Sequence, residues 1–207
     1  MAYYLLENAL PLLAELLFIT GAVLLPGRFL VYLHFLFCLL IYIYFRWKRS
    51  FSSRAWKYAA QDGESFWGPV LSTAGAIAVC FLLTGMIPGL QNGMFKMQIQ
   101  SWLEILLFAV SSLFLAPIAE ELLFRKSLIS TKTAGSLVIT ALISLLLFAL
   151  EQGVTPGGVL TALIWGIPLT VSYIRTRNIY IPMTAHLLCS LISSGVDLIS
   201  LISFKLY

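Results

Sequence analysis

Apolar residues run through this chain in long stretches that are separated only by short polar segments. A hydrocarbon core about 30 Å thick takes about 20 apolar residues to cross as a helix. Glycine, proline and asparagine, which break helices or form turns, stand between the stretches. The predicted spans cover residues 5–25, 28–45, 66–88, 102–130, 134–152, 157–175 and 180–204. The pattern therefore predicts an all-α fold, a polytopic transmembrane helix bundle of about seven spans.

Composition supports a membrane protein and excludes several other classes. Hydrophobic residues make up 60% of the 207 residues and charged residues only 11%, whereas soluble proteins carry roughly 25% charged residues. The length fits one membrane domain over residues 1–207. No basic face is interleaved with exposed aromatic residues, so we expect no nucleic-acid partner. All three cysteines lie in apolar runs and are expected to be buried rather than paired or bound to zinc.

The basic residues predict how the bundle is oriented. They concentrate in the loops after the second, fourth and sixth spans, which fall on one side if there are seven spans. These residues are Arg46, Lys48, Arg49, Arg54, Lys57, Lys126, Lys132, Arg175 and Arg177. Because lysine and arginine favour cytoplasmic loops, we expect a cytoplasmic N-terminus and an external C-terminus. The mixed segment 91–102 is expected at the outer interface, with Trp102 as an aromatic anchor.

Ionisable residues inside the spans are the strongest indication of function. Each costs at least about 2.5–3.5 kcal/mol at the bilayer centre, so such groups usually face the bundle interior or a wet cavity. The fourth predicted span contains adjacent carboxylates, Glu120 and Glu121, followed by Arg125. Glu121 and Arg125 are i,i+4 neighbours and can pair along one helix face. Glu120 points about 100° away and has no such partner, which suits it to accept a proton from water.

The alternative interpretation of these residues is a charged cluster at the helix end. Their depth in the membrane distinguishes that cluster from a buried site. Glu120 lies twelve residues before Lys132, about 18 Å along a helix. His186 lies nine residues after Arg177, roughly 14–19 Å into the seventh span if the segment before Pro182 is partly extended. A lone histidine is more often a packed core residue, but this one shares the depth of the glutamate pair. We therefore expect the two groups to share a site.

Two other predicted spans, the fifth and the first, also contain acidic residues. The fifth span ends at Glu151 and Gln152 and is followed by a glycine- and proline-rich break. Irregular backbone at membrane depth is tolerated only against protein or a water-filled cavity, so both residues are expected to face the same polar chamber. Glu15 lies deep in the first span, and the sequence offers no partner that can be assigned to it.

These residues together resemble a known family. The pattern Glu-Glu-x-x-x-Arg, then Phe-x-x-x-His, then His-x-x-x-Asn is typical of the CPBP family, the CAAX prenyl endopeptidase and bacteriocin-processing group of intramembrane proteases, also called Abi proteins. The resemblance covers residues 102–194, the CPBP-like core. The residues that match the motifs are Glu120, Glu121, Arg125, Phe148 and His186. Two positions depart, because Gln152 stands where the family has histidine and Ser190 where it often has asparagine.

The resemblance implies a role for each of these positions. Glu120 would be the base that activates water, and His186 with Ser190 would stabilise the oxyanion. Glu121 and Arg125 would complete the site. Gln152 cannot carry a proton as histidine would, although its amide can hold a water molecule.

Three functions remain open from the sequence. The first is an intramembrane endopeptidase in the cell membrane of a bacterium, acting on a peptide or a lipidated protein that enters from the lipid. The second, favoured by Gln152, is a catalytically impaired relative that binds or regulates a membrane protein partner. The third is a small transporter or proton pathway, since buried acids also serve that purpose. No cofactor is implied, and no bound metal is expected, because His34 is the only other histidine and no familiar ligand spacing is present.

Overall fold

The computed structural model describes residues 9–90 and 94–206, and in this part of the chain all regular structure is helical. Residues 5–8 of the first predicted span and residues 91–93 of the predicted interfacial segment lie outside the described residues. The chain forms α2 (Ala9–Leu24), η1 (Gly27–Phe29), α3 (Leu30–Trp47), α4 (Ser53–Gln61), α5 (Glu64–Gly85), α6 (Trp102–Val110), η3 (Ser111–Leu115), α7 (Ala116–Glu120), η4 (Glu121–Ser127), α8 (Ala134–Gln152), α9 (Pro156–Thr176) and α10 (Tyr180–Leu206).

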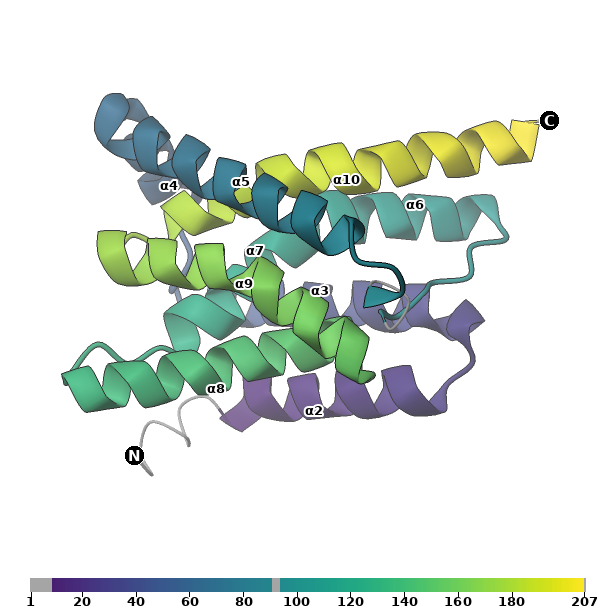
Figure 1. Cartoon of the computed structure of the whole chain (residues 1–207), viewed down its shortest axis with the longest axis horizontal. Helices are drawn as coiled ribbons and strands as arrows, with labels where there is room; N and C mark the ends of the chain where they lie inside the picture. The colour runs from purple at the N-terminus through teal and green to yellow at the C-terminus, as the bar shows by residue number, and fades with distance from the viewer. Residues whose placement is uncertain (1–8, 91–93, 207) are drawn as a thin grey trace.

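The long helices form a bundle of membrane-spanning length (Figure 1). Within the described residues, six helical segments are long and apolar enough to cross a bilayer, and α2 is a shorter apolar helix beside them. Large apolar side chains such as Leu17, Ile192 and Phe204 are exposed on the outside of the bundle, as expected for surfaces that contact lipid. The predicted polytopic helical membrane fold is confirmed, with six long spans and one short helix in place of seven equal ones.

Helix ends follow the local sequence closely. Ser101 and Thr133 each begin a helix with a capping box, and Thr155 caps α9 just before Pro156. The predicted fourth span runs on to residue 130, whereas the helix ends at Ser127. The start of α10 also differs from the expectation of an extended segment up to residue 181, because the helix already begins at Tyr180.

The short helix α4 is a feature that the apolar pattern did not predict. It lies between α3 and α5, and its Trp56 side chain donates a hydrogen bond to Thr184 Oγ1 of α10 at 2.8 Å. The Trp56 ring also stacks on Tyr180, with 6.2 Å between ring centroids. Nearby, Lys126 Nζ donates to the Ser50 carbonyl oxygen. These contacts bring α4, the start of α10, the end of η4 and the loop after α3 together, so the loops rich in basic residues lie at one end of the bundle.

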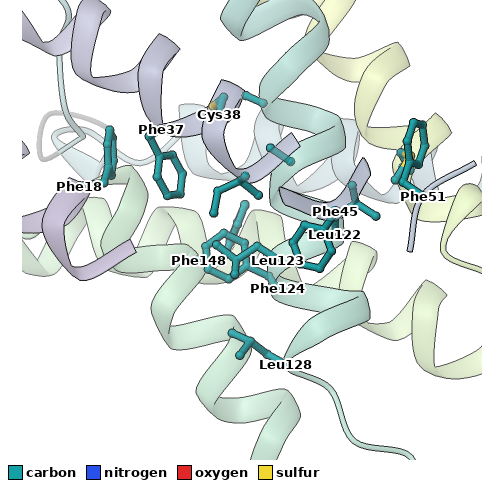
Figure 2. Packing of buried hydrophobic residues seen from close by; sticks show 14 of the residues in the cluster. Phe18, Phe37, Cys38, Phe45, Phe51, Leu122, Leu123, Phe124, Leu128 and Phe148 are labelled. Carbon is teal, nitrogen blue, oxygen red and sulfur yellow. The ribbon is translucent and has the colours of Figure 1, made fainter. Parts of the chain in front are cut away.

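The core is densest around the helix that runs from α6 to η4. Leu122, Leu123 and Phe124 are fully buried, and the Phe124 ring meets Phe148 of α8 edge-on at a centroid distance of 5.6 Å (Figure 2). The Ser144 hydroxyl of α8 donates to the Phe124 carbonyl oxygen. These contacts fix the position of the segment that carries the two adjacent glutamates.

Close packing of α8 against α9 depends on Gly166. A Cβ atom at this position would lie 2.6 Å from Leu145 Cδ1 and 2.8 Å from Phe148 Cδ1. Small residues at helix interfaces in membranes allow this approach. Because Phe148 also contacts Arg125, Gly166 helps to place the ionisable residues.

We expect Gly166→Ala to lower the free energy of unfolding by about 1–3 kcal/mol through overpacking. The measurement is the thermal unfolding midpoint of the purified protein in detergent micelles. Gly75→Ala in α5 is the matched control, because no heavy atom lies within 4 Å of its added Cβ. Equal midpoints for the two variants would show that the α8–α9 contact is looser than described.

Candidate active site

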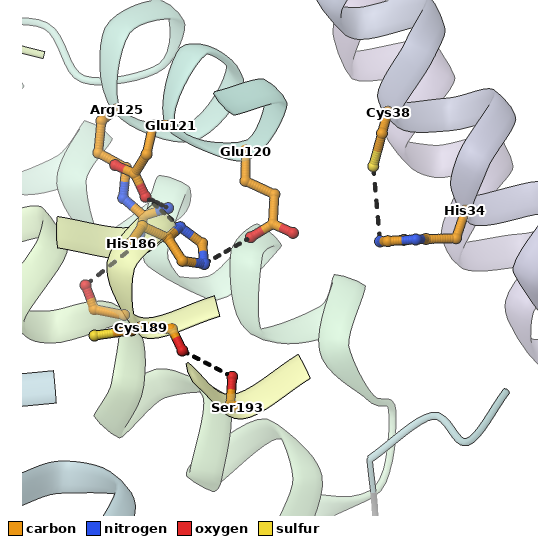
Figure 3. A network of polar contacts seen from close by, with 9 residues as sticks. His34, Cys38, Glu120, Glu121, Arg125, His186, Cys189 and Ser193 are labelled. Atoms are coloured by element: carbon orange, nitrogen blue, oxygen red, sulfur yellow. Dashed lines mark hydrogen bonds and ion pairs between the residues drawn. The ribbon is translucent and has the colours of Figure 1, made fainter. Parts of the chain in front are cut away.

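Four ionisable side chains from two parts of the bundle meet in its interior (Figure 3). Glu120 ends α7, Glu121 and Arg125 lie in η4, and His186 lies in α10. Arg125 Nη1 lies 3.2 Å from Glu121 Oε1. His186 Nδ1 lies 3.1 Å from the same Glu121 oxygen, and His186 Nε2 lies 3.8 Å from Glu120 Oε2. The residues predicted from the fourth and seventh spans are thus brought together.

The Glu121–Arg125 pair forms the fully enclosed side of this network. Both side chains have no exposed surface. The Arg125 guanidinium also donates through Nη2 to the Gly166 carbonyl oxygen at 3.4 Å and lies 4.4 Å from the Phe148 ring centroid. A buried carboxylate is tolerated when a cation and hydrogen bonds compensate its charge. Arg125 supplies that compensation for Glu121, in the i,i+4 pairing that the spacing predicted.

His186 connects the two glutamates and is the most accessible member of the network. Its side chain is 17% exposed, whereas the Glu120 side chain is 4% exposed. A carboxylate can only accept, so the contact with Glu121 assigns the proton of the neutral ring to Nδ1. Nε2 then faces Glu120 across a gap wider than a direct hydrogen bond. This gap lies on the more open side of the network, where a water molecule or a substrate atom would meet both groups.

The helix carrying the glutamates is irregular on both sides of Glu120. The segments η3 and η4 are π-helical and flank the single short α-helical stretch α7. Short π-helical segments inside α-helices occur frequently at functional sites. Adjacent residues of a regular α-helix lie about 100° apart, yet Glu120 and Glu121 both contact one imidazole ring. A sequence pattern gives no sign of these π-helical segments, so this feature was not predicted.

The two positions that depart from the family pattern also lie near the network. Gln152 ends α8, and its side chain is close enough to Glu120 to interact with the carboxyl group. Its backbone carbonyl accepts a hydrogen bond from Phe95 N at 2.9 Å. Ser190 is half-buried and lies one helical turn after His186 on α10. Gln152 therefore approaches Glu120 from α8, whereas His186 approaches it from α10.

A second group of buried acids lies close to Glu120 in the described structure. Glu15 and Glu151 are buried, and each is close enough to Glu120 for the carboxyl groups to interact electrostatically. Glu151 was expected to face the chamber, whereas the sequence gave no partner for Glu15. Across residues 9–90 and 94–206, no three histidine, cysteine or acidic side chains are arranged to hold a metal ion.

Comparisons with known proteins identify the part of the chain that carries this network. Residues 101–192 match the family model described as type II CAAX prenyl endopeptidase Rce1-like. No curated protein and no solved structure gives a significant match. The matched segment includes Glu120, His186 and the residues between them, and it confirms the resemblance inferred from the motifs. Residues 101–192 of this integral membrane protein are therefore similar to the Rce1-like family of type II CAAX prenyl endopeptidases.

Proposed function

We propose that this protein is an intramembrane endopeptidase in which Glu120 activates a water molecule for attack on a peptide carbonyl. The observation that carries the proposal is the contact of Glu120 with His186 in a buried network between membrane-spanning helices. A carboxylate held within reach of water in such a network is suited to general base catalysis. The core over residues 102–194 carries this chemistry, and α2 to α5 support it within a single membrane domain over 1–207.

Each member of the network has a separate task in this mechanism. Glu120 takes a proton from water as the oxygen bonds to the carbonyl carbon, and it passes that proton to the amine as the carbon–nitrogen bond breaks. In its doubly protonated form, His186 donates from Nε2 into the same gap and, with Ser190 one turn away, stabilises the negative oxygen of the tetrahedral intermediate. Glu121 fixes the orientation of the imidazole, and Arg125 balances the charge of Glu121.

The surroundings of the network support a substrate that comes from the bilayer. The exposed outer surface of the helices is apolar, so a peptide or a lipidated protein segment can reach the site laterally. The basic loops gathered at the end of the bundle near α4 support a cytoplasmic location for that end and for the N-terminus. Bacterial cell membrane is the proposed location.

A second candidate function rests on Gln152. The amide side chain at this position cannot take up and release protons in the useful range, as a histidine would. The protein would then be a scaffold with the protease fold that binds or regulates a membrane protein partner. The proximity of the Gln152 amide to Glu120 favours the catalytic proposal, because the amide can help to hold a water molecule beside the base.

We expect Glu120→Gln to reduce cleavage of a peptide library by about 10²–10⁴-fold, because the amide cannot act as a base. Cleavage is measured by mass spectrometry with the purified protein in lipid vesicles. Glu64→Gln, at an exposed position in the first turn of α5, is the matched control and should keep full activity. Wild-type cleavage that survives Glu120→Gln unchanged would refute the proposed mechanism.

The change Gln152→His tests the two candidate functions against each other. If the native protein is a protease that uses Gln152 to hold water, the change should alter cleavage by about tenfold or less, with a new dependence on pH from the imidazole. The same vesicle assay over a range of pH provides the measurement. Cleavage that is absent from the native protein and appears only in Gln152→His would instead support the scaffold.

A further inference from the structure

The interior of the described bundle contains more acids than bases. Four glutamates are buried, namely Glu15, Glu120, Glu121 and Glu151. Among the buried residues of the described segments, Arg125 is the only lysine or arginine, and it pairs with Glu121. His186 can offset one further negative charge, and it lies against Glu120 and Glu121. Neither Glu15 nor Glu151 therefore has a cation paired with it, although the charge of Arg125 acts weakly on Glu151.

These two acids share one chamber on the side of Glu120 that faces α2 and α3. Glu15 of α2 interacts electrostatically with Glu120, and Glu151 of α8 interacts with both. Cys38 of α3 lies near all three carboxyl groups, with its sulfur 3.7 Å from His34 Nε2. Figure 3 shows this His34–Cys38 pair across from the Glu120 carboxyl group. No carboxyl oxygen of Glu15 or Glu151 has a hydrogen-bond partner within the described structure.

A cavity borders this chamber at Glu151 and His34. It has a volume of about 70 Å³, and its polar lining comes from His34, Glu151 and Gln152. Its apolar lining comes from Phe18, Leu30, Met94, Phe95 and Met97. A water molecule needs only about 10–15 Å³ of such space together with polar partners, so the cavity has room for several. Water in it reaches both the unpartnered Glu151 carboxyl group and the amide that contacts Glu120.

Burial and mutual repulsion decide where negative charge resides in this chamber. An unpaired carboxylate in a low-dielectric interior is far more costly than the neutral acid, which needs only hydrogen bonds to water. Three adjacent carboxylates would also repel one another, since like charges disfavour each other's ionised forms. Glu120 has the strongest compensation, because His186 Nε2 lies 3.8 Å from its Oε2 and Arg125 also acts on it, whereas Arg125 is the weakest of the influences on Glu151. One negative charge on Glu120 is thus the favoured arrangement.

We propose that Glu15 and Glu151 are positioning residues that remain neutral carboxylic acids and thereby leave the negative charge of the chamber to Glu120. This inference rests on the proposed function of Glu120 as a base. The cavity gives water access to Glu151, while Glu15 is fully buried beside it. In the reaction they neither gain nor lose a proton, because the proton of the attacking water goes to Glu120 and then to the amine. Their ionisation at alkaline pH places like charge beside Glu120 and distorts the network.

The protonation state is tested without any cleavage assay. Infrared difference spectra of Glu15→Gln and Glu151→Gln against the native protein at neutral pH should show the loss of a carbonyl stretch from a protonated carboxyl group. Glu64→Gln, at an exposed position, should lose a carboxylate band instead. Gln matches the shape of the neutral acid, and thermal midpoints identify any variant that fails to fold. Loss of carboxylate bands from Glu15→Gln and Glu151→Gln would overturn the inference.

The positioning role is tested by the pH dependence of cleavage. If ionisation of the pair limits the native protein at alkaline pH, Glu15→Gln and Glu151→Gln should each extend the active range to higher pH, because the amides cannot ionise. If cleavage by the native protein and by both variants declines over the same alkaline pH range, the positioning role is wrong. Cleavage that does not depend on Glu120 would refute the proposed protease mechanism separately. The infrared test of protonation does not depend on that outcome.

Discussion

The electrostatic cost of carboxyl groups inside a lipid-spanning bundle is the constraint on which the rest of this structure depends. Water cannot screen these groups across the bilayer core, so each needs a cation, a hydrogen bond or a proton. Glu121 is held by Arg125 and His186, and Glu120 by His186 and Gln152. Close packing of Gly166 and Phe148 keeps the guanidinium in place. The fold therefore serves to hold these charges together as much as to bury apolar surface.

Much of the fold could be predicted because lipid imposes a simple length and composition on a spanning helix. The apolar runs gave the long helices, and their boundaries were correct to within a few residues except at residues 128–130. The pattern could not reveal α4, because its position is set by contacts of Trp56 with Thr184 and Tyr180 that are distant in sequence. It could not reveal the π-helical segments either, since these depend on packing rather than on residue type.

The candidate site was accessible from the sequence for a related reason. Charges are rare in membrane spans, so each one stands out, and the i,i+4 spacing of Glu121 and Arg125 indicates their pairing directly. The proximity of His186 to the glutamate pair was predicted from the similar depths of these residues along two helices. Such depths can be compared because both helices cross the same bilayer. The partners of Glu15 could not be found in this way, because depth alone does not say which helix faces which. The packing of α2 against α3 and α8 supplies that information.

The replacement at position 152 is best understood from the charges around it. A histidine there would place a second titratable ring beside Glu120, whereas Gln152 is neutral at every relevant pH and still interacts with Glu120. The chamber behind it already contains the carboxyl groups of Glu15 and Glu151, which have no hydrogen-bond partner in the described structure. A neutral amide adds a donor for Glu120 without adding a charge that must itself be balanced in the interior. The neutral amide of Gln152 and the two buried acids thus belong to a single electrostatic environment.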